Sequence, residues 1–250
     1  MSLVFEKKKC LRYRAVVLVE RDYDILEYIL EMKFASLQNV FEKFFSRLQS
    51  GEVAKSNEWA TRRLQQLTKA GFLKAAYSFS HRARFYLLTN KGYEVLRKGR
   101  LSLDPLGPSF TIDHRTFDHD RLVLESRIML ENRRAASCWV SDKRLRSSRE
   151  LAGGLVLSHV PDGLFVNERG EKVAFELEYS VKPRKVLEEK IRRYVMMMRS
   201  SDERLRVFDR VLYVCARPMS YERVKKEIEI YGDLIEVMML DQFFGKRSGS

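Results

Sequence analysis

The chain has 250 residues, of which 45% are hydrophobic and only five are proline, so an intrinsically disordered protein is excluded. Its net charge of +13 favours an anionic partner, and residues 1–100 carry 20 Lys and Arg against 10 Asp and Glu. The three cysteines have no CxxC spacing, so no structural zinc is implied. No apolar stretch has the pattern of a secretory leader or the length of about 20 residues that spans a bilayer. We therefore expect a cytoplasmic protein that does not bind membranes.

The N-terminal part predicts three helices followed by a β-hairpin. Apolar residues recur at helical spacing over three segments, residues 22–32, 36–48 and 57–72. In the third segment Trp59, Leu64 and Leu67 are expected to face the core, and Gly71 to end the helix. Two apolar stretches around a polar turn predict paired strands, residues 72–79 and 84–89. A short helix is expected to follow, over residues 92–97.

This layout is that of a winged helix-turn-helix domain, which we predict over residues 15–98. In such domains the third helix lies in the DNA major groove and the hairpin lies against the backbone. The candidate DNA-binding residues on these two elements are Arg62, Arg63, Lys69, His81, Arg82 and Arg84. The sequence thus predicts binding of double-stranded DNA, and a protein-binding winged helix is the alternative. We also expect a homodimer, because such proteins often bind two half-sites.

Residues 99–112 contain two prolines and two glycines and are predicted to be a linker to a second domain over residues 113–244. Helices and short apolar strands alternate in this second domain, and two successive strands form a hairpin. The pattern predicts a mixed sheet, so the fold class of the chain is α/β (α+β). The expected helices cover residues 118–132, 183–199 and 220–230. The expected strands cover residues 136–140, 159–166, 172–178, 207–215 and 234–240.

Three acidic residues lie close together in the predicted hairpin of the second domain. Asp162 opens the first strand, while Glu176 and Glu178 share one face of the second, because side chains alternate along a strand. If the strands pair, the three carboxylates converge. Such a cluster is unfavourable unless a divalent cation neutralises it. The sequence therefore predicts a site for Mg²⁺ or Mn²⁺, or the remains of one.

The order of elements in the second domain resembles that of the PD-(D/E)XK nuclease fold. The resemblance implies a helix residue, Glu125, and the two strand residues Asp162 and Glu176 as metal ligands, with the carbonyl of Leu177 as a backbone ligand. A metal held by such oxygen ligands would polarise a phosphate and lower the pKa of a bound water.

The lysine of the PD-(D/E)XK tripeptide is replaced here by Glu178. The resemblance extends to a QxxxY motif on the next helix, where this chain has Lys190 and Tyr194 on one face. Lys190 is the main candidate for the missing cation, and Lys182 is a weaker one. The alternatives are that Glu178 is an additional ligand or that the site has lost catalysis. The candidate catalytic residues are Asp162, Glu176, Glu178 and Lys190.

A second resemblance covers almost the whole chain and is to the plasmid replication-relaxation family. It is carried by the segments VERD at 19–22, SLQNVFEKFF at 36–45, AGFL at 70–73 and VPDG at 160–163, by His119 and Trp139, and by the acid-x-acid strand with its following Lys…Tyr helix. An acidic residue at position 178 agrees with this family. The resemblance implies a winged helix fused to a nuclease-like domain and a role with plasmid or mobile-element DNA. His119 and Tyr194 are accessory candidates.

Two functions follow from these features. The first is a metal-dependent DNA nuclease or nickase. The second is a non-catalytic DNA-binding regulator or replication factor whose nuclease-like domain serves dimerisation or DNA contact. The chain has neither a P-loop nor a Rossmann glycine pattern, so we expect no nucleotide cofactor.

Overall fold

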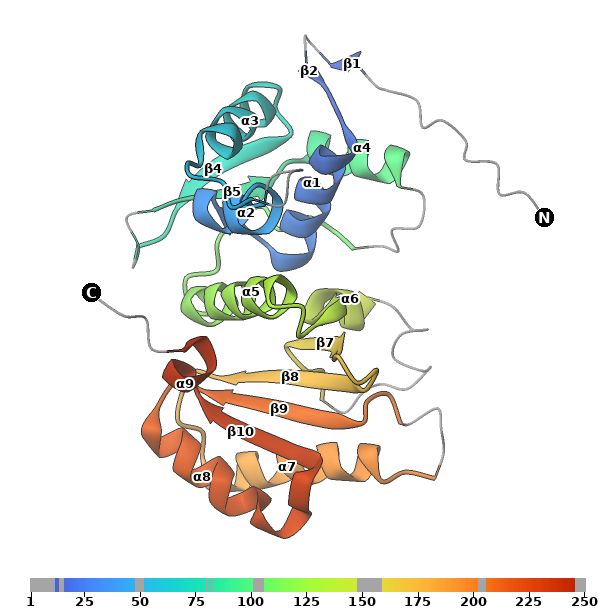
Figure 1. The fold of residues 1–250 in the computed structure, drawn as a ribbon, viewed down its shortest axis with the longest axis vertical. Helices are drawn as coiled ribbons and strands as arrows, with labels where there is room; N and C mark the ends of the chain where they lie inside the picture. The colour runs from blue at the N-terminus through green and yellow to red at the C-terminus, as the bar shows by residue number, and fades with distance from the viewer. Residues whose placement is uncertain are drawn as a thin grey trace, which may run out of the picture. The chain divides into compact units, whose positions relative to one another are not determined.

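The computed structural model describes residues 12–13, 16–47, 52–79, 81, 83–100, 106–147, 159–201 and 206–245. The chain divides into two compact units, Met1–Phe117 and Asp118–Ser250. The fold is mixed α/β, and its largest sheet has five strands (Figure 1). No helix in the described ranges is both long and apolar enough to cross a membrane.

The first unit contains the predicted helices and hairpin, with ends that differ by a few residues. Its helices are α1 (Glu20–Met32), α2 (Leu37–Phe44), α3 (Glu58–Lys69) and α4 (Asn90–Gly99). Its strands are β1 (Arg12–Tyr13), β2 (Val16–Val17), β3 (Ala35–Ser36), β4 (Leu73–Tyr77) and β5 (Arg84–Leu88). β4 and β5 pair antiparallel, and the short strand β3 pairs with β5 on its other side.

Local contacts define where the helices of the first unit begin and end. The Ser36 hydroxyl accepts a hydrogen bond from the backbone N–H of Asn39 at 3.1 Å and so caps α2. Gly71 follows Ala70, the C-cap residue of α3, and has φ of +79°, a conformation that glycine adopts readily. The core between the helices is apolar and includes the fully buried residues Ile25, Leu26, Ile29, Leu64 and Leu67.

The described part of the predicted linker makes contacts within the first unit. The guanidinium of Arg100 binds three carboxylates of α1, those of Glu20, Asp24 and Glu27. Further along, Phe110 lies under the ammonium of Lys74, 5.7 Å from its ring centroid. These contacts tie both ends of the segment to the unit that precedes it.

The second unit has the predicted order of strands and helices, with two short helices that the sequence did not predict, α6 and α9. Its helices are α5 (Phe117–Asn132), α6 (Asp142–Ser147), α7 (Arg184–Met198), α8 (Pro218–Ile228), η1 (Glu229–Leu234) and α9 (Leu240–Phe244). Its strands are β6 (Ser137–Ser141), β7 (Gly163–Val166), β8 (Lys172–Glu178), β9 (Arg210–Cys215) and β10 (Ile235–Met239).

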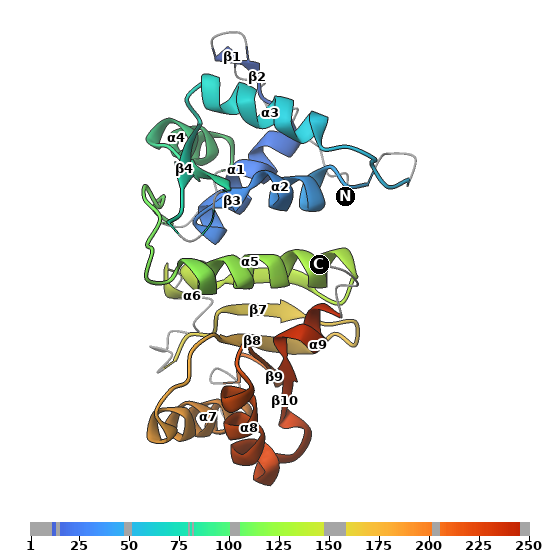
Figure 2. The ribbon, with the colours of Figure 1, turned by 90° about the vertical axis from the view of Figure 1, so that its left-hand side faces the viewer.

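The sheet of the second unit is mixed, with strand order β10-β9-β8-β7-β6. β8, β9 and β10 are parallel, whereas β6 and β7 run antiparallel to their neighbours. Helices α7 and α8 cover one face and α5 and α6 lie on the other (Figures 1 and 2). Alternation along β8 directs Phe175 to Trp139 of β6, at a ring distance of 5.5 Å, and Glu176 to the α7 layer.

Gly163 follows Asp162 at the start of β7, where Trp139 packs directly against the backbone. A Cβ atom at this position would lie 2.2 Å from Cζ2 of Trp139. The glycine of the VPDG segment therefore allows the indole to lie flat on the strand, and Trp139 stacks on Phe165 at 5.7 Å.

Candidate functional site

Glu176 lies at the centre of a cluster of polar side chains between β8 and α7, and only 2% of its surface is exposed. Its Oε2 atom accepts a hydrogen bond from Nζ of Lys190 at 2.6 Å. Its Oε1 atom accepts from Nε2 of His159 at 2.9 Å and from the hydroxyl of Tyr194. Both carboxylate oxygens are thus bonded to donors from the chain itself.

The charges of this cluster compensate one another. Burial by itself would raise the pKa of Glu176, but the Lys190 ammonium and the His159 imidazole outweigh it and lower that pKa to about 2. Burial would likewise lower the pKa of Lys190, and the Glu176 carboxylate raises it instead. Tyr194 has a raised pKa because it is buried beside Glu176, so it is a neutral hydroxyl donor. Glu176 and Lys190 thus form a buried ion pair, and the neutral Tyr194 hydroxyl donates to the same carboxylate.

Asp162 lies immediately before β7, not inside the strand as predicted. Its Oδ2 atom accepts the backbone N–H of Leu177 at 2.9 Å and lies 3.2 Å from Nε2 of His119. The other ring nitrogen of His119 is 3.4 Å from Oδ1 of Asp120. Burial would lower the pKa of His119, but the two carboxylates raise it to about 10, so the imidazolium is the stable form at neutral pH.

The residue of α5 that contacts Asp162 is therefore His119, and not the predicted ligand Glu125. Oε1 of Glu125 accepts a hydrogen bond from Nη1 of Arg121 at 2.7 Å, one helical turn away. The predicted accessory residues His119 and Tyr194, in contrast, both contact a predicted metal ligand.

The residues present do not fit a magnesium centre. Mg²⁺ prefers free oxygen ligands in octahedral geometry, whereas Glu176 already has Lys190 on one oxygen and two donors on the other. Within the described residues, no three His, Cys, Asp or Glu side chains are grouped so that they could hold a metal ion. Two cationic side chains of the chain itself lie in this acidic cluster, Lys190 beside Glu176 and His119 beside Asp162.

Glu178, at the lysine position of the tripeptide, has a cation of its own. Its Oε2 atom is 3.3 Å from Nζ of Lys182, an ion pair without hydrogen-bond geometry. Both strand glutamates face α7, and each is matched by one of the two lysines that the sequence proposed as substitutes. Burial, with a smaller contribution from Glu178, raises the pKa of the neighbouring Cys215 to about 12, so this thiol is protonated.

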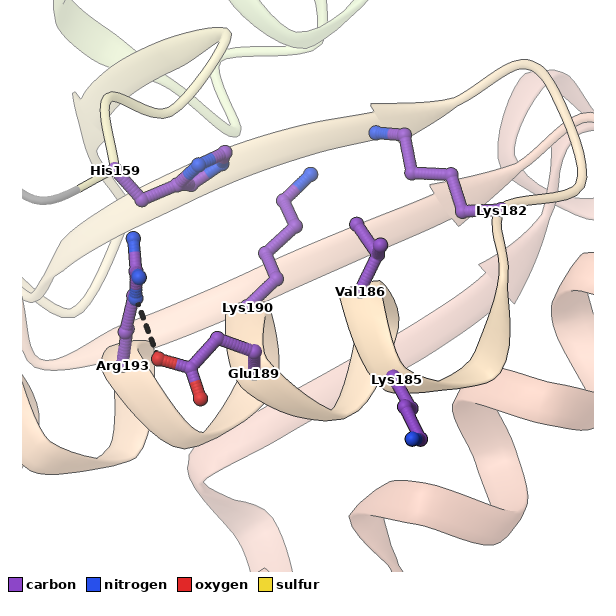
Figure 3. Close-up of a pocket in the computed structure, with 7 residues that line it drawn as sticks. All are labelled: His159, Lys182, Lys185, Val186, Glu189, Lys190 and Arg193. Atoms are coloured by element: carbon purple, nitrogen blue, oxygen red, sulfur yellow. Dashed lines mark hydrogen bonds and ion pairs between the residues drawn. The ribbon is translucent and has the colours of Figure 1, made fainter.

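A pocket of about 390 Å³ opens next to this cluster along α7. We call it the α7 pocket, and the side chains around it are mostly cationic (Figure 3). Sequence spacing does not predict this pocket, because it depends on how α7 lies over the end of β8.

The predicted DNA-binding residues of α3 divide into two groups. Arg62 and Lys69 are exposed and belong to no ion pair among the residues that can be described. Arg63 instead binds Asp22 of α1 through two nitrogens, with Nε 2.6 Å from Oδ1, and donates to the carbonyl of Val17 at 2.9 Å. Arg63 is thus a structural residue whose charge is used inside the unit.

Trp59 is 69% exposed, so its predicted place in the core was wrong. Ala60 takes that place, because it shares a helical face with Leu64 and Leu67. Trp59 lies on the outer face, where the guanidinium of Arg62 is 5.7 Å from its ring centroid. The outer face of α3 thus combines an aromatic ring with cations.

The hairpin places its candidate residues differently. Arg84 is exposed, and its Nε atom is 3.3 Å from the hydroxyl of Tyr77 on β4. His81 is half-buried, with its ring 5.7 Å from that of Phe117. Arg82 lies outside the described residues.

Comparison with known proteins identifies a family but no individual relative. The family model described as replication-relaxation matches residues 26–211, which is more than half of the chain. No curated protein and no solved structure matches the chain.

Proposed function

Because this chain belongs to the replication-relaxation family, we propose that it is a DNA-binding factor in the replication or relaxation of plasmid or mobile-element DNA. In this proposal the first unit is a winged helix-turn-helix that binds double-stranded DNA through α3 and the β4–β5 hairpin. The second unit is nuclease-like in the order of its elements but does not depend on Mg²⁺ or Mn²⁺ and does not cut DNA. Two copies bind two half-sites as a homodimer in the cytoplasm.

The outer face of α3 carries the DNA-binding part of the proposal. Trp59, Arg62 and Lys69 are exposed on it, at spacings of three and seven residues that place them on one side of the helix. Neither cation is neutralised within the described part of the chain. Cations on an exposed helix face are suited to phosphate contacts, and an aromatic ring beside them adds apolar contact with sugars or bases.

The pairing of Glu176 with Lys190 supports the non-catalytic assignment of the second unit. A nuclease of the PD-(D/E)XK type needs oxygen ligands that are free to hold a metal, and here the central one is bonded to an ammonium group.

The test of DNA binding uses a labelled duplex and a double substitution, Arg62→Ala with Lys69→Ala. We expect weaker binding and a plot of log K against log salt that is shallower by about 2, one unit for each lost phosphate contact. The matched control is Arg97→Ala with Lys98→Ala, which removes two exposed charges from α4 of the same unit. Equal effects of the two double variants would contradict the proposed interface.

Trp59 provides a second measurement on the same face. The chain has two tryptophans, and the other, Trp139, is buried in the second unit. Duplex DNA is therefore expected to change the fluorescence of Trp59, and Trp59→Phe should remove the change.

The test of catalysis uses supercoiled plasmid with Mn²⁺ or Mg²⁺. We expect the plasmid to remain intact. Nicking by the unaltered protein that Asp162→Ala abolishes would instead assign the metal-dependent nuclease activity to this chain.

A further inference from the structure

The α7 pocket is lined by four cationic side chains and a histidine but only one carboxylate. Its charged lining residues are His159, Lys182, Lys185, Glu189, Lys190 and Arg193. In Figure 3 the side chains of His159, Lys182 and Lys190 converge on the space above α7, whereas Lys185 points away from it at the rim. We propose that this pocket binds a phosphate group of a nucleotide or of DNA, and does so without a metal ion.

The carboxylates behind the pocket do not oppose an anion there. Glu176 is bonded to Lys190, and Glu178 is paired with Lys182. Glu189, the carboxylate in the lining, accepts from Nε of Arg193 at 2.9 Å. Each negative charge near the pocket is therefore matched by a positive one, and Lys185 remains with no ion pair in the described residues. The lysines and the arginine around the pocket therefore outnumber the nearby carboxylates, and the net charge there is positive.

Lys182 is the side chain best suited to bind the ligand. Its contact with Glu178 is 3.3 Å long and lacks hydrogen-bond geometry, and its side chain is 38% exposed. An ammonium group has three donors, so Lys182 can bind a phosphate oxygen and keep its ion pair. Lys190 is different, because it is buried and bonded to Glu176. In this proposal Lys182 contacts the phosphate directly, and Lys190 acts only through the electrostatic field of its ion pair with Glu176.

The size and the walls of the pocket favour a nucleotide over a small inorganic anion alone. A volume of about 390 Å³ is at the lower end of the range of ligand pockets. Val186, which lines the pocket next to the lysines, is half exposed and offers apolar surface to a sugar or a base. The methylene chains of the lysines extend this apolar wall while their charged ends face the phosphate.

The test is an NMR titration of the full chain with inorganic phosphate, dAMP, and one oligonucleotide in 5′-phosphorylated and 5′-hydroxyl forms. We expect a saturable shift of a single one of the four histidine signals, that of His159. Tightest binding of dAMP assigns the site to free nucleotides. Tightest binding of the oligonucleotides assigns it to DNA, and a preference for the 5′-phosphorylated form identifies an end. All three results support the proposal.

The variant for this test is Lys182→Gln with Lys185→Gln, which should weaken binding about tenfold, a change of about 1.4 kcal/mol. Lys225→Gln with Lys226→Gln is the matched control, since it removes two exposed charges from α8 of the same unit. Lys182→Arg keeps the cation and should bind as the unaltered protein does. An unshifted His159 signal, or equal weakening by both double variants, would overturn the proposal. Duplex binding by α3 is measured separately and can succeed when the pocket fails.

Discussion

Nζ of Lys190 on α7 and Oε2 of Glu176 on β8 are 2.6 Å apart, and both side chains are buried. The two residues are 14 positions apart in the chain and meet because α7 packs on the face of the sheet that Glu176 occupies. Hydrogen bonds from His159 and Tyr194 complete the site. A lysine thus stands next to the carboxylate where a nuclease would need a metal ion.

Removing one partner of this pair is expected to destabilise the protein strongly. Lys190→Met leaves the Glu176 carboxylate buried without its main cation, which typically costs about 3–5 kcal/mol of unfolding free energy. The double variant Glu176→Gln with Lys190→Met should recover part of the loss, since no buried charge remains. Chemical denaturation measures both, with Lys185→Met as a control on the exposed side of α7. If Lys190→Met unfolds at the same denaturant concentration as the control, the pair is not structural.

Glu176 should also determine how stability falls in acid. Its pKa is about 2 in the folded chain and 4.5 in the unfolded one, so the ionised group stabilises the fold fully above pH 4.5. This contribution is lost as the pH falls from 4.5 towards 2. We expect Glu176→Gln to flatten the acid limb of the stability curve in that window. Glu222→Gln, an exposed change on α8, should leave the limb unaltered. Parallel acid limbs for all three proteins would refute the assignment.

His119 should make the stability of the fold depend on pH in the opposite direction, with a loss at alkaline pH. Its pKa is raised from 6.5 to about 10 beside Asp120 and Asp162, so its stabilising charge is complete below pH 6.5. The contribution disappears as the pH rises towards 10. Replacing His119 by Gln should flatten stability between pH 6.5 and 10, and direct NMR titration should show a His119 ring that stays protonated at pH 8. His114→Gln, at an exposed position, serves as the control. A His119 ring that titrates near 6.5 would contradict the predicted ion pairs.

Substitution of the two neighbouring arginines on α3 should affect stability to very different extents. Arg63→Ala leaves the buried Asp22 carboxylate without its guanidinium, and we expect a loss of roughly 3 kcal/mol. Arg62→Ala removes an exposed side chain and should change the unfolding free energy by less than about 0.5 kcal/mol. Thermal and chemical unfolding of the two variants test this difference. A larger loss of stability for Arg62→Ala than for Arg63→Ala would show that the roles are reversed.

Much of the fold follows from local periodicity. Strand β8 (Lys172–Glu178) has the bounds that the sequence predicts, and the helices of the first unit begin and end close to the predicted residues. The helices and strands themselves were predicted better than the direction in which individual side chains point. Trp59 was assigned to the core because it is apolar, yet Ala60 has the position on the helix that turns inward. Glu125 was predicted to be a metal ligand because of its position on the helix. In the structure it accepts a hydrogen bond from Arg121 of the same helix.

The sequence alone determined that Glu176 and Glu178 share a face of one strand and that Lys190 and Tyr194 share a face of one helix, because both relations depend only on the repeat of a single element. Only the tertiary structure decided that these two faces meet. It brought the Lys190 ammonium to Glu176, paired Glu178 with Lys182 and placed His119 beside Asp162. The charge state of a buried carboxylate depends on distance and burial, which residue spacing does not contain.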